Sequence, residues 1–187
     1  MTLNYKLTFL DYWHLGSGLS AGAKLDSSVV KDDDGVPYAS GKTIKGLVRE
    51  MALELKYDCQ FLDRCFGSTS DKDDICYKQK SKLTSGKYYF TNATLDQTIK
   101  KEIVANKLQT NLYDVIASTQ LKDGLAVDDS LREIEVVIPL TLEGKIMDIE
   151  SEEDCKKLTK SLKMIKRMGL NRNRGLGRCT FEVECIK

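Results

Sequence analysis

Two segments, one near each end of the chain, place glycine residues beside lysine and arginine. The first runs from Ser40 to Arg49 and the second from Gly169 to Arg178. Glycine lets a backbone approach a ligand closely and tolerates positive φ angles. Lysine and arginine supply the charge that holds phosphate oxygens. The pattern therefore indicates binding of a polyanion, and a nucleic acid is the first candidate.

The first segment is expected to lie where a loop enters a helix. A helix N-terminus favours anions through its free N–H groups and its dipole. Helical spacing places Lys42, Lys45 and Arg49 on one face. A well-capped surface helix is the alternative, and the upstream glycine of a Walker loop is missing. The candidate contacts in this segment are Gly41, Lys42, Lys45 and Arg49.

The second segment sets three arginines among three glycines. An ordinary turn decorated with solvated charges is the alternative interpretation. Arginine forks match phosphate oxygens, so a phosphate-binding loop is favoured. The candidate contacts here are Arg172, Arg174, Gly175, Gly177 and Arg178.

The distribution of charge is more informative than its sum. The formal net charge is +1, which does not by itself indicate a nucleic-acid-binding protein. Residues 156–178 contain basic side chains and no acidic ones, whereas acids gather at 32–34, 71–74 and 150–154. Such segregation can form a basic face on a neutral protein. A solvated helix face explains residues 156–167 equally well.

The sequence shows no secretory signal and no apolar run of membrane-spanning length, so a cytoplasmic protein is expected. Its six cysteines should then be mostly reduced thiols. Cys59, Cys65 and Cys76 could donate three thiolates to a structural zinc ion. Their spacing fits no tight zinc knuckle and no fourth ligand is evident, so burial of reduced sulfur is favoured.

Hydrophobic patterns predict an α+β chain with the order strand, helix, strand, strand, helix, strand. This is the ferredoxin-like, RRM-like βαββαβ pattern, within one domain covering residues 1–187. Residues 14–39 and 67–86 are interpreted as long loop insertions, and 99–115 is ambiguous. The sheet lacks a clear aromatic RNA-reading signature, so RNA contacts should come from loops. The predicted elements are strand 3–9, helix 44–56 capped by Ser40 or Thr43, strand 88–95, a strand or hairpin over 132–148 with Gly144 at its turn, helix 152–168 and strand 179–185.

Four segments, in this order and spacing, carry a resemblance to a known family. They are residues 14–18 (His-Leu-Gly-Ser-Gly), 25–49, 65–68 (Cys-Phe-Gly-Ser) followed by 90–93, and 175–178 (Gly-Leu-Gly-Arg). Together they resemble the RAMP superfamily, the repeat-associated proteins of CRISPR systems. Within that superfamily they look most like the repeated backbone subunit of type III effector complexes.

Two features depart from the family pattern. The family often has Pro-Gly-Ser-Ser where this chain has Ser40-Gly41-Lys42-Thr43, which adds a cation and removes a rigid proline. The chain is also somewhat short for a backbone subunit. This leaves room for a smaller accessory RAMP subunit.

The resemblance implies binding of a CRISPR guide RNA and of complementary target RNA, with other type III subunits and head-to-tail copies of the chain as partners. It adds Lys31, in the early loop, and Lys122 to the RNA contacts. Lys122 lies in a thumb-like hairpin at about 113–132. An apolar tip such as Leu121, Leu125 or Val127 would wedge open a base step.

The resemblance also implies cleavage of bound target RNA through Asp26. This carboxylate could hold a divalent cation, Mg²⁺, or help to deprotonate the attacking 2′-hydroxyl. A turn-capping aspartate is the alternative, and the acids at 32–34 compete for the role. No metal-ligand set is assigned.

Three other functions are retained as alternatives. They are a non-catalytic RAMP scaffold, an endoribonuclease that processes CRISPR precursor RNA, and a ferredoxin-like protein interaction module. A processing enzyme would call for a catalytic histidine. The one histidine, His14, is interpreted as a packing or hydrogen-bonding residue.

Overall fold

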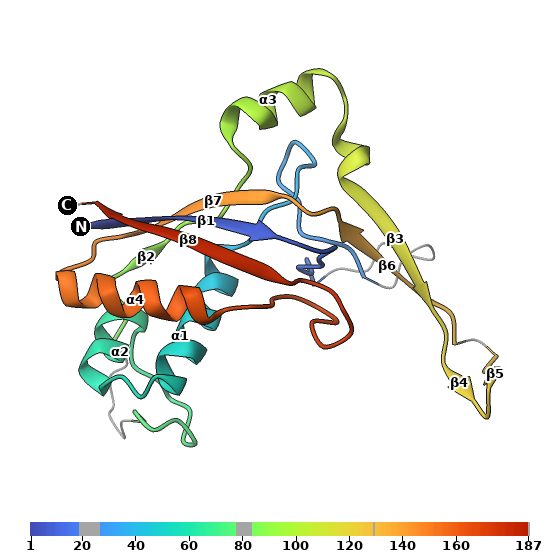
Figure 1. Ribbon diagram of the computed structural model, residues 1–187. Helices are drawn as coiled ribbons and strands as arrows, with labels where there is room; N and C mark the ends of the chain where they lie inside the picture. The colour runs from blue at the N-terminus through green and yellow to red at the C-terminus, as the bar shows by residue number, and fades with distance from the viewer. Residues whose placement is uncertain (19–26, 78–83, 129, 187) are drawn as a thin grey trace.

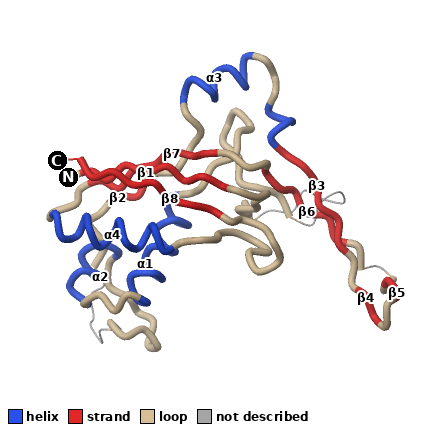
Figure 2. The backbone as a smooth tube through the Cα atoms, in the orientation of Figure 1, coloured by secondary structure: helices blue, strands red, loops and turns tan. Residues whose placement is uncertain are grey.

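The computed structural model describes residues 1–18, 27–77, 84–128 and 130–186, and for Leu121 and Ala126 it describes the backbone alone. Figures 1 and 2 show a central sheet, helices packed against it and a hairpin that projects from it. The elements are β1 (Thr2–Phe9), α1 (Gly41–Glu54), α2 (Cys59–Phe66), β2 (Tyr89–Phe90), α3 (Gln97–Ala105), the 3-10 helix η2 (Gln109–Leu112), β3 (Tyr113–Ser118), β4 (Leu121–Lys122), β5 (Leu125–Ala126), β6 (Arg132–Val137), β7 (Thr141–Met147), α4 (Glu152–Met164) and β8 (Cys179–Ile186).

A four-stranded antiparallel sheet in the order β2-β7-β1-β8 forms the centre of the fold. The first strand of the chain therefore lies between the third and fourth strands of this sheet, with the second strand at the edge. This is the ferredoxin-like arrangement, and the predicted α+β fold class is confirmed. In Figure 1, α1, α2 and α4 cover one face of the sheet.

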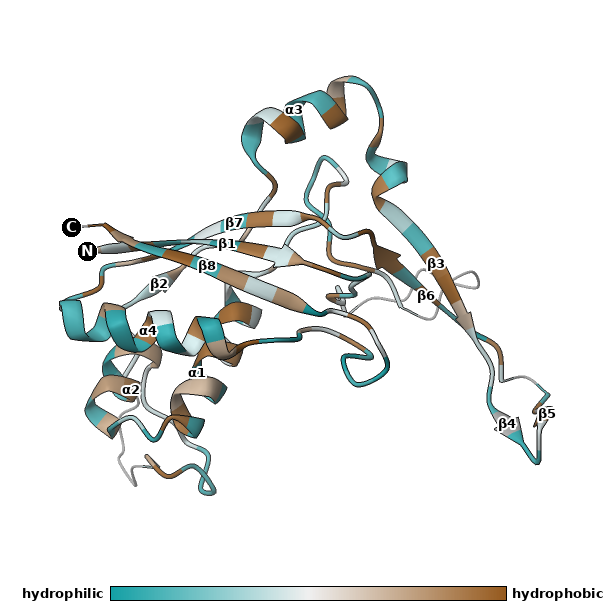
Figure 3. Ribbon diagram, in the orientation of Figure 1, coloured by the Kyte–Doolittle hydropathy of each residue, from teal (hydrophilic) through white to brown (hydrophobic). Residues whose placement is uncertain are grey.

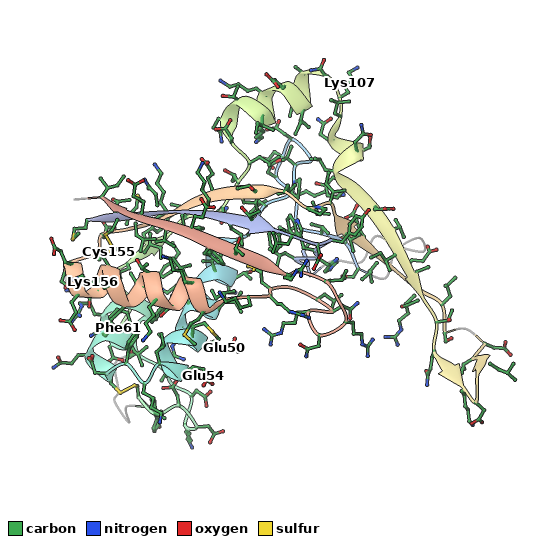
Figure 4. All side chains as sticks on the ribbon, in the orientation of Figure 1. Glu50, Glu54, Phe61, Lys107, Cys155 and Lys156 are labelled. Atoms are coloured by element: carbon green, nitrogen blue, oxygen red, sulfur yellow. A yellow bond between two sulfur atoms is a disulfide. The ribbon has the colours of Figure 1, made fainter. Side chains whose placement is uncertain are left out.

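The core lies between the sheet and these helices. Alternation along β1 buries its odd-numbered residues from Leu3 to Phe9 and leaves the even-numbered ones on the open face. Ile44 of α1 and Leu158 of α4 are fully buried against them, as is Phe61 of α2, which Figure 4 labels. Each such side chain contributes about 1.5–3 kcal/mol relative to its exposed state.

Gly144 was expected at a turn, and this expectation is wrong. Gly144 lies inside β7, paired with Tyr5 of β1. A side chain at Gly144 would clash with the ring and hydroxyl of Tyr5, so the glycine makes room for that buried ring. The turn lies earlier, at residues 138–140, and it separates β6 and β7 into different sheets.

Other boundaries also differ from the sequence pattern. The strand expected over residues 88–95 shortens to the two residues of β2. Beyond β2, Ala93 and Thr94 make only isolated bridges, to Ala39 and Glu143. The ambiguous residues 99–115 form α3, η2 and the start of β3. Helix α4 ends at Met164, earlier than expected.

The thumb-like hairpin is present and longer than expected, and residues 113–137 are called the hairpin arm below. β3 and β6 pair in antiparallel register from Tyr113 opposite Val137 to Ser118 opposite Arg132. At the tip, β4 and β5 flank Asp123 and Gly124, whose φ angles of 50° and 82° form a tight turn. The arm projects away from the sheet in Figure 1.

The expectation of reduced cysteines is wrong for two pairs. Cys59 at the start of α2 bonds to Cys76, with a Cα–Cα distance of 5.5 Å. Cys155 of α4 bonds to Cys185 of β8. Sequence spacing does not reveal such proximity, because the partners come from separate elements. Cys65 and Cys179 are free and buried.

These pairs also bear on the zinc site considered from the sequence. The disulfide removes two of its three thiolates, those of Cys59 and Cys76. Burial raises the pKa of the third thiol, that of Cys65. Within the described ranges, no helix is long and apolar enough to cross a membrane.

The Gly144 site gives a prediction about stability. We expect Gly144→Ala to lower the free energy of unfolding by about 1–3 kcal/mol, because the new methyl group overpacks against Tyr5. Gly46→Ala is the matched control, since nothing lies within 4 Å of its added Cβ in α1. The control should gain about 0.5–1 kcal/mol. Urea unfolding measures both, and equal midpoints for the two variants would contradict the packing account.

Candidate nucleic-acid interface

Of the two caps that the sequence offers for helix α1, Ser40 and Thr43, the structure uses Ser40. The Ser40 side chain accepts the N–H of Thr43 at 3.1 Å. The N–H of Gly41 donates to Asn92 at 2.9 Å. A side chain at Gly41 would clash with the carbonyl group of Phe90, so this buried glycine lets the helix start pack against β2. Its role is packing within the fold.

The three cations of α1 differ in their surroundings. Lys42 is exposed, and within the described residues it has no ion pair. Lys45 is half-buried, 6.0 Å from the ring centre of Phe90. Arg49 forms a 2.5 Å ion pair with Asp74. Lys42 is therefore the cation of this helix best placed to meet a phosphate group.

The loop between α4 and β8, residues 169–177 and called the glycine loop, is fixed at both ends. Leu170 N–H donates to the His14 carbonyl at 2.9 Å, and Gly177 N–H donates to the Tyr12 carbonyl at 2.8 Å. Gly169 has a φ of 95°, and a side chain there would clash with the His14 carbonyl. These contacts hold the loop against the segment that follows β1.

The part of the glycine loop between these anchors carries its charge on the outside. Arg172 and Arg174 are exposed. Gly175, which follows them in the loop, has no atom within 4 Å of the position that a Cβ would take. Figure 3 colours the tip of this loop hydrophilic. Arg178, by contrast, pairs with Asp11 at 3.1 Å. The two loop arginines are thus the better candidates for phosphate contacts.

Hollows border this loop, and two of them join it to other segments. The first, of about 680 Å³, joins the early loop at residues 14–18 and at Ser27 and Val30, the start of α1, and residues 169–170. The second, of about 540 Å³, has Arg174 on one side. Its other walls come from hairpin-arm residues 118–120, 127, 128, 130 and 132. The segments singled out from the sequence at the two ends of the chain therefore meet on one side of the molecule.

Lys31 is engaged within the fold. Its ammonium group donates to the Glu135 carboxylate at 2.7 Å and lies 4.0 Å from the ring centre of Tyr113. His14 is buried and both ring nitrogens have partners, as the sequence interpretation expected. The partners Glu135, Asp74 and Asp11 were not predicted, because each lies far along the chain from its cation.

Asp26, the predicted catalytic residue, lies outside the described residues. Its competitors at 32–34 lie within the described residues. Asp32 accepts the N–H groups of Asp34 and Val36, and it pairs with Lys100 at 2.7 Å. Burial acts to raise the pKa of Asp32, but the bonds from Lys100, Val36 and Asp34 outweigh it and hold that pKa below its usual range. Asp32 is therefore a turn cap and a weak base.

The hairpin arm exposes apolar side chains at its tip. Leu125 is 75% exposed and Val127 is 36% exposed. Lys122 is also exposed there. Val115 and Leu131, nearer the base of the arm, are exposed as well and were missed from the sequence. An exposed apolar surface of this kind can pack against nucleobases.

Comparison with known proteins now identifies the family. The profile described as the RAMP superfamily matches residues 6–180. The chain belongs to the RAMP superfamily. Comparison with curated proteins gives no significant match.

Two solved structures contain chains similar to this RAMP protein. One is "Cryo-EM structure of the Type III-B Cmr-beta bound to cognate target RNA", with a TM-score of 0.71, 9% identity, and coverage of 98% of this chain and 97% of that chain. The other is "Type III-B Cmr-beta Cryo-EM structure of the Apo state", with a TM-score of 0.69, 10% identity, and the same coverage. At such identities the likeness shows a shared fold.

The geometry yields a prediction for RNA binding. Replacing Lys42, Arg172 and Arg174 together by Ala should weaken binding of single-stranded RNA, because three exposed cations are lost. The slope of log affinity against log salt should fall by about 0.7 per phosphate contact, or by about 2 in all. Fluorescence anisotropy with labelled RNA at several salt concentrations measures this slope.

A charge-matched control is available for that experiment. Lys72, Lys101 and Lys145 are exposed lysines outside this interface. Replacing these three by Ala removes the same charge and should leave the salt slope close to that of the parent. Equal slopes for the two triple variants would mean that the glycine loop is a solvated turn.

Proposed function

We propose that this RAMP protein binds the sugar–phosphate backbone of a CRISPR guide RNA, as a backbone subunit of a type III ribonucleoprotein. The observation that carries the proposal is the anchored glycine loop, which exposes Arg172 and Arg174 and places Arg174 beside the hairpin arm. Family membership and the likeness to chains of a type III-B complex bound to target RNA support it.

Binding through phosphates explains how one surface can accept many guide sequences. Arginine and lysine side chains hold phosphate oxygens without reading bases. The exposed Leu125 and Val127 of the hairpin arm would then separate neighbouring bases. Copies assembled head to tail, through a heterologous contact, would repeat this arrangement along the guide and leave bases free to pair with target RNA.

Purification of the protein together with the products of its native operon tests this proposal. Sequencing of the associated RNA should recover guides derived from CRISPR repeats. The Lys42, Arg172 and Arg174 triple variant should recover less of this RNA than the Lys72, Lys101 and Lys145 control. RNA without repeat-derived guides would refute the proposal.

We further propose that the bound target RNA is cut with the help of Asp26. A carboxylate with an ordinary pKa is a weak base for a 2′-hydroxyl, so much of the rate must come from the geometry imposed on the RNA. Among the described residues, no group of three or more histidine, cysteine or carboxylate side chains could hold a metal ion. We therefore derive no step through Mg²⁺, and the assay compares its presence with EDTA.

A non-catalytic scaffold is the second candidate, and a specific observation favours it over precursor processing. His14 is buried, and a carbonyl and a serine occupy its two ring nitrogens, so it is poorly placed to reach a substrate. Asp32 and Asp34 are both paired with Lys100. If Asp26 does not cut, Asp33, an exposed carboxylate in the same loop, is the next candidate.

Substitution of Asp26 separates these functions. In the guide-bound complex, Asp26→Ala should abolish cuts at regular intervals in complementary RNA, while target affinity stays nearly constant because no cation is lost. Asp33→Asn is the matched control, an exposed carboxylate in the same loop, and should cut at the parental rate. Gel electrophoresis of end-labelled target RNA measures the cleavage rate of both variants. Loss of cutting in the control alone would assign the role to Asp33.

A further inference from the structure

Glu135, near the base of the hairpin arm, is a buried carboxylate that the proposed RNA contacts do not use. It lies in β6 and is 8% exposed. One carboxylate oxygen accepts the N–H of Val29 at 3.0 Å, and the other accepts the ammonium group of Lys31 at 2.7 Å. A side chain of the arm thus holds two points of the early loop.

The backbone of the same residue holds the loop at a third point. Its N–H donates to the carbonyl of Ser27 at 3.2 Å. Its carbonyl lies 2.6 Å from Nδ1 of His14, and Nε2 of His14 lies 3.0 Å from the Ser27 hydroxyl. A carbonyl can only accept, so Nδ1 carries a proton, and in the neutral ring Nε2 then accepts from the Ser27 hydroxyl.

We infer that Glu135 and His14 are positioning residues, which fix the segment from Ser27 to Lys31 onto the hairpin arm. This segment directly follows Asp26, so the inference rests on the proposed cleavage function. The hairpin arm, which would hold the RNA, and the early loop, which would cut it, are then attached to each other through Glu135 and His14. Separating Val29 and Lys31 from this buried carboxylate would leave it without partners, which is costly, so these contacts oppose release of the loop.

The first experiment measures whether residues 27–31 stay docked on the hairpin arm. Hydrogen exchange of a peptide covering residues 27–31 is compared between the parent chain, Glu135→Met and Glu135→Gln. Glutamine can still accept the N–H of Val29 but cannot pair with the charge of Lys31. Exchange should accelerate by about 10-fold or more in the methionine variant and by less in the glutamine variant. Unchanged exchange in Glu135→Met overturns the inference, whether or not the protein cuts RNA.

The second experiment reads the consequence for cutting. In the guide-bound complex, Glu135→Met should slow cleavage of bound target by about 10- to 100-fold, with guide affinity nearly unchanged. Glu135→Gln should recover part of the rate. Glu102→Gln, which removes an exposed carboxylate from α3, is the control and should cut normally. Faster exchange with a parental cleavage rate would overturn the positioning role.

The two readouts separate failure of this inference from failure of the proposed function. If the parent complex does not cut target RNA at all, the proposed cleavage is wrong. Hydrogen exchange then still decides whether Glu135 fixes the loop. His14→Phe provides the second variant, because it removes the bonds to Glu135 and Ser27 while filling a similar volume. It should accelerate exchange of the same peptide, and a parental exchange rate would overturn the role of His14.

Discussion

Residues 12–14, just beyond the end of β1, join three segments of the candidate interface: the glycine loop, the hairpin arm and the early loop. The Tyr12 carbonyl accepts the N–H of Gly177, and the His14 carbonyl accepts the N–H of Leu170. These two bonds fix both ends of the glycine loop. The backbone N–H and carbonyl of Trp13 both bond to the backbone of Val137 at the base of the hairpin arm. The buried imidazole of His14 forms a hydrogen bond with the Ser27 hydroxyl of the early loop. These three segments are therefore positioned by one short stretch of chain, residues 12–14.

The arrangement of charge explains how a nearly neutral protein can present a basic surface. Lys31, Arg49 and Arg178 each pair with a carboxylate from a distant part of the chain. These pairs hold loops in place and leave little charge for a ligand. Among the described residues, the exposed cations of the interface that form no such pair lie at the start of α1, in the glycine loop and on the hairpin arm. A local excess of charge matters more for RNA binding than the total.

The glycines of the two motifs serve the fold more than the ligand. Gly41 and Gly169 have neighbouring carbonyl groups where a side chain would be, so their substitution would move α1 or the glycine loop. Gly175 alone among the glycines predicted to touch RNA has open space around it. Close backbone packing and close ligand approach both favour glycine, and the sequence does not distinguish them.

The sequence by itself determined the core order of strand, helix, strand, strand, helix, strand, the position of the first helix cap at Ser40 or Thr43, and the family, because alternation, helical period and capping are local properties. The arrangement of β2, β7, β1 and β8 follows from that order. Only the tertiary structure decided that Gly144 lies under Tyr5, and that Lys31 and Arg49 meet Glu135 and Asp74. Lys31 and Glu135 are 104 residues apart, and no local pattern encodes a pairing across that distance. Whether a cation is free for RNA therefore depends on contacts that exist only in the folded chain.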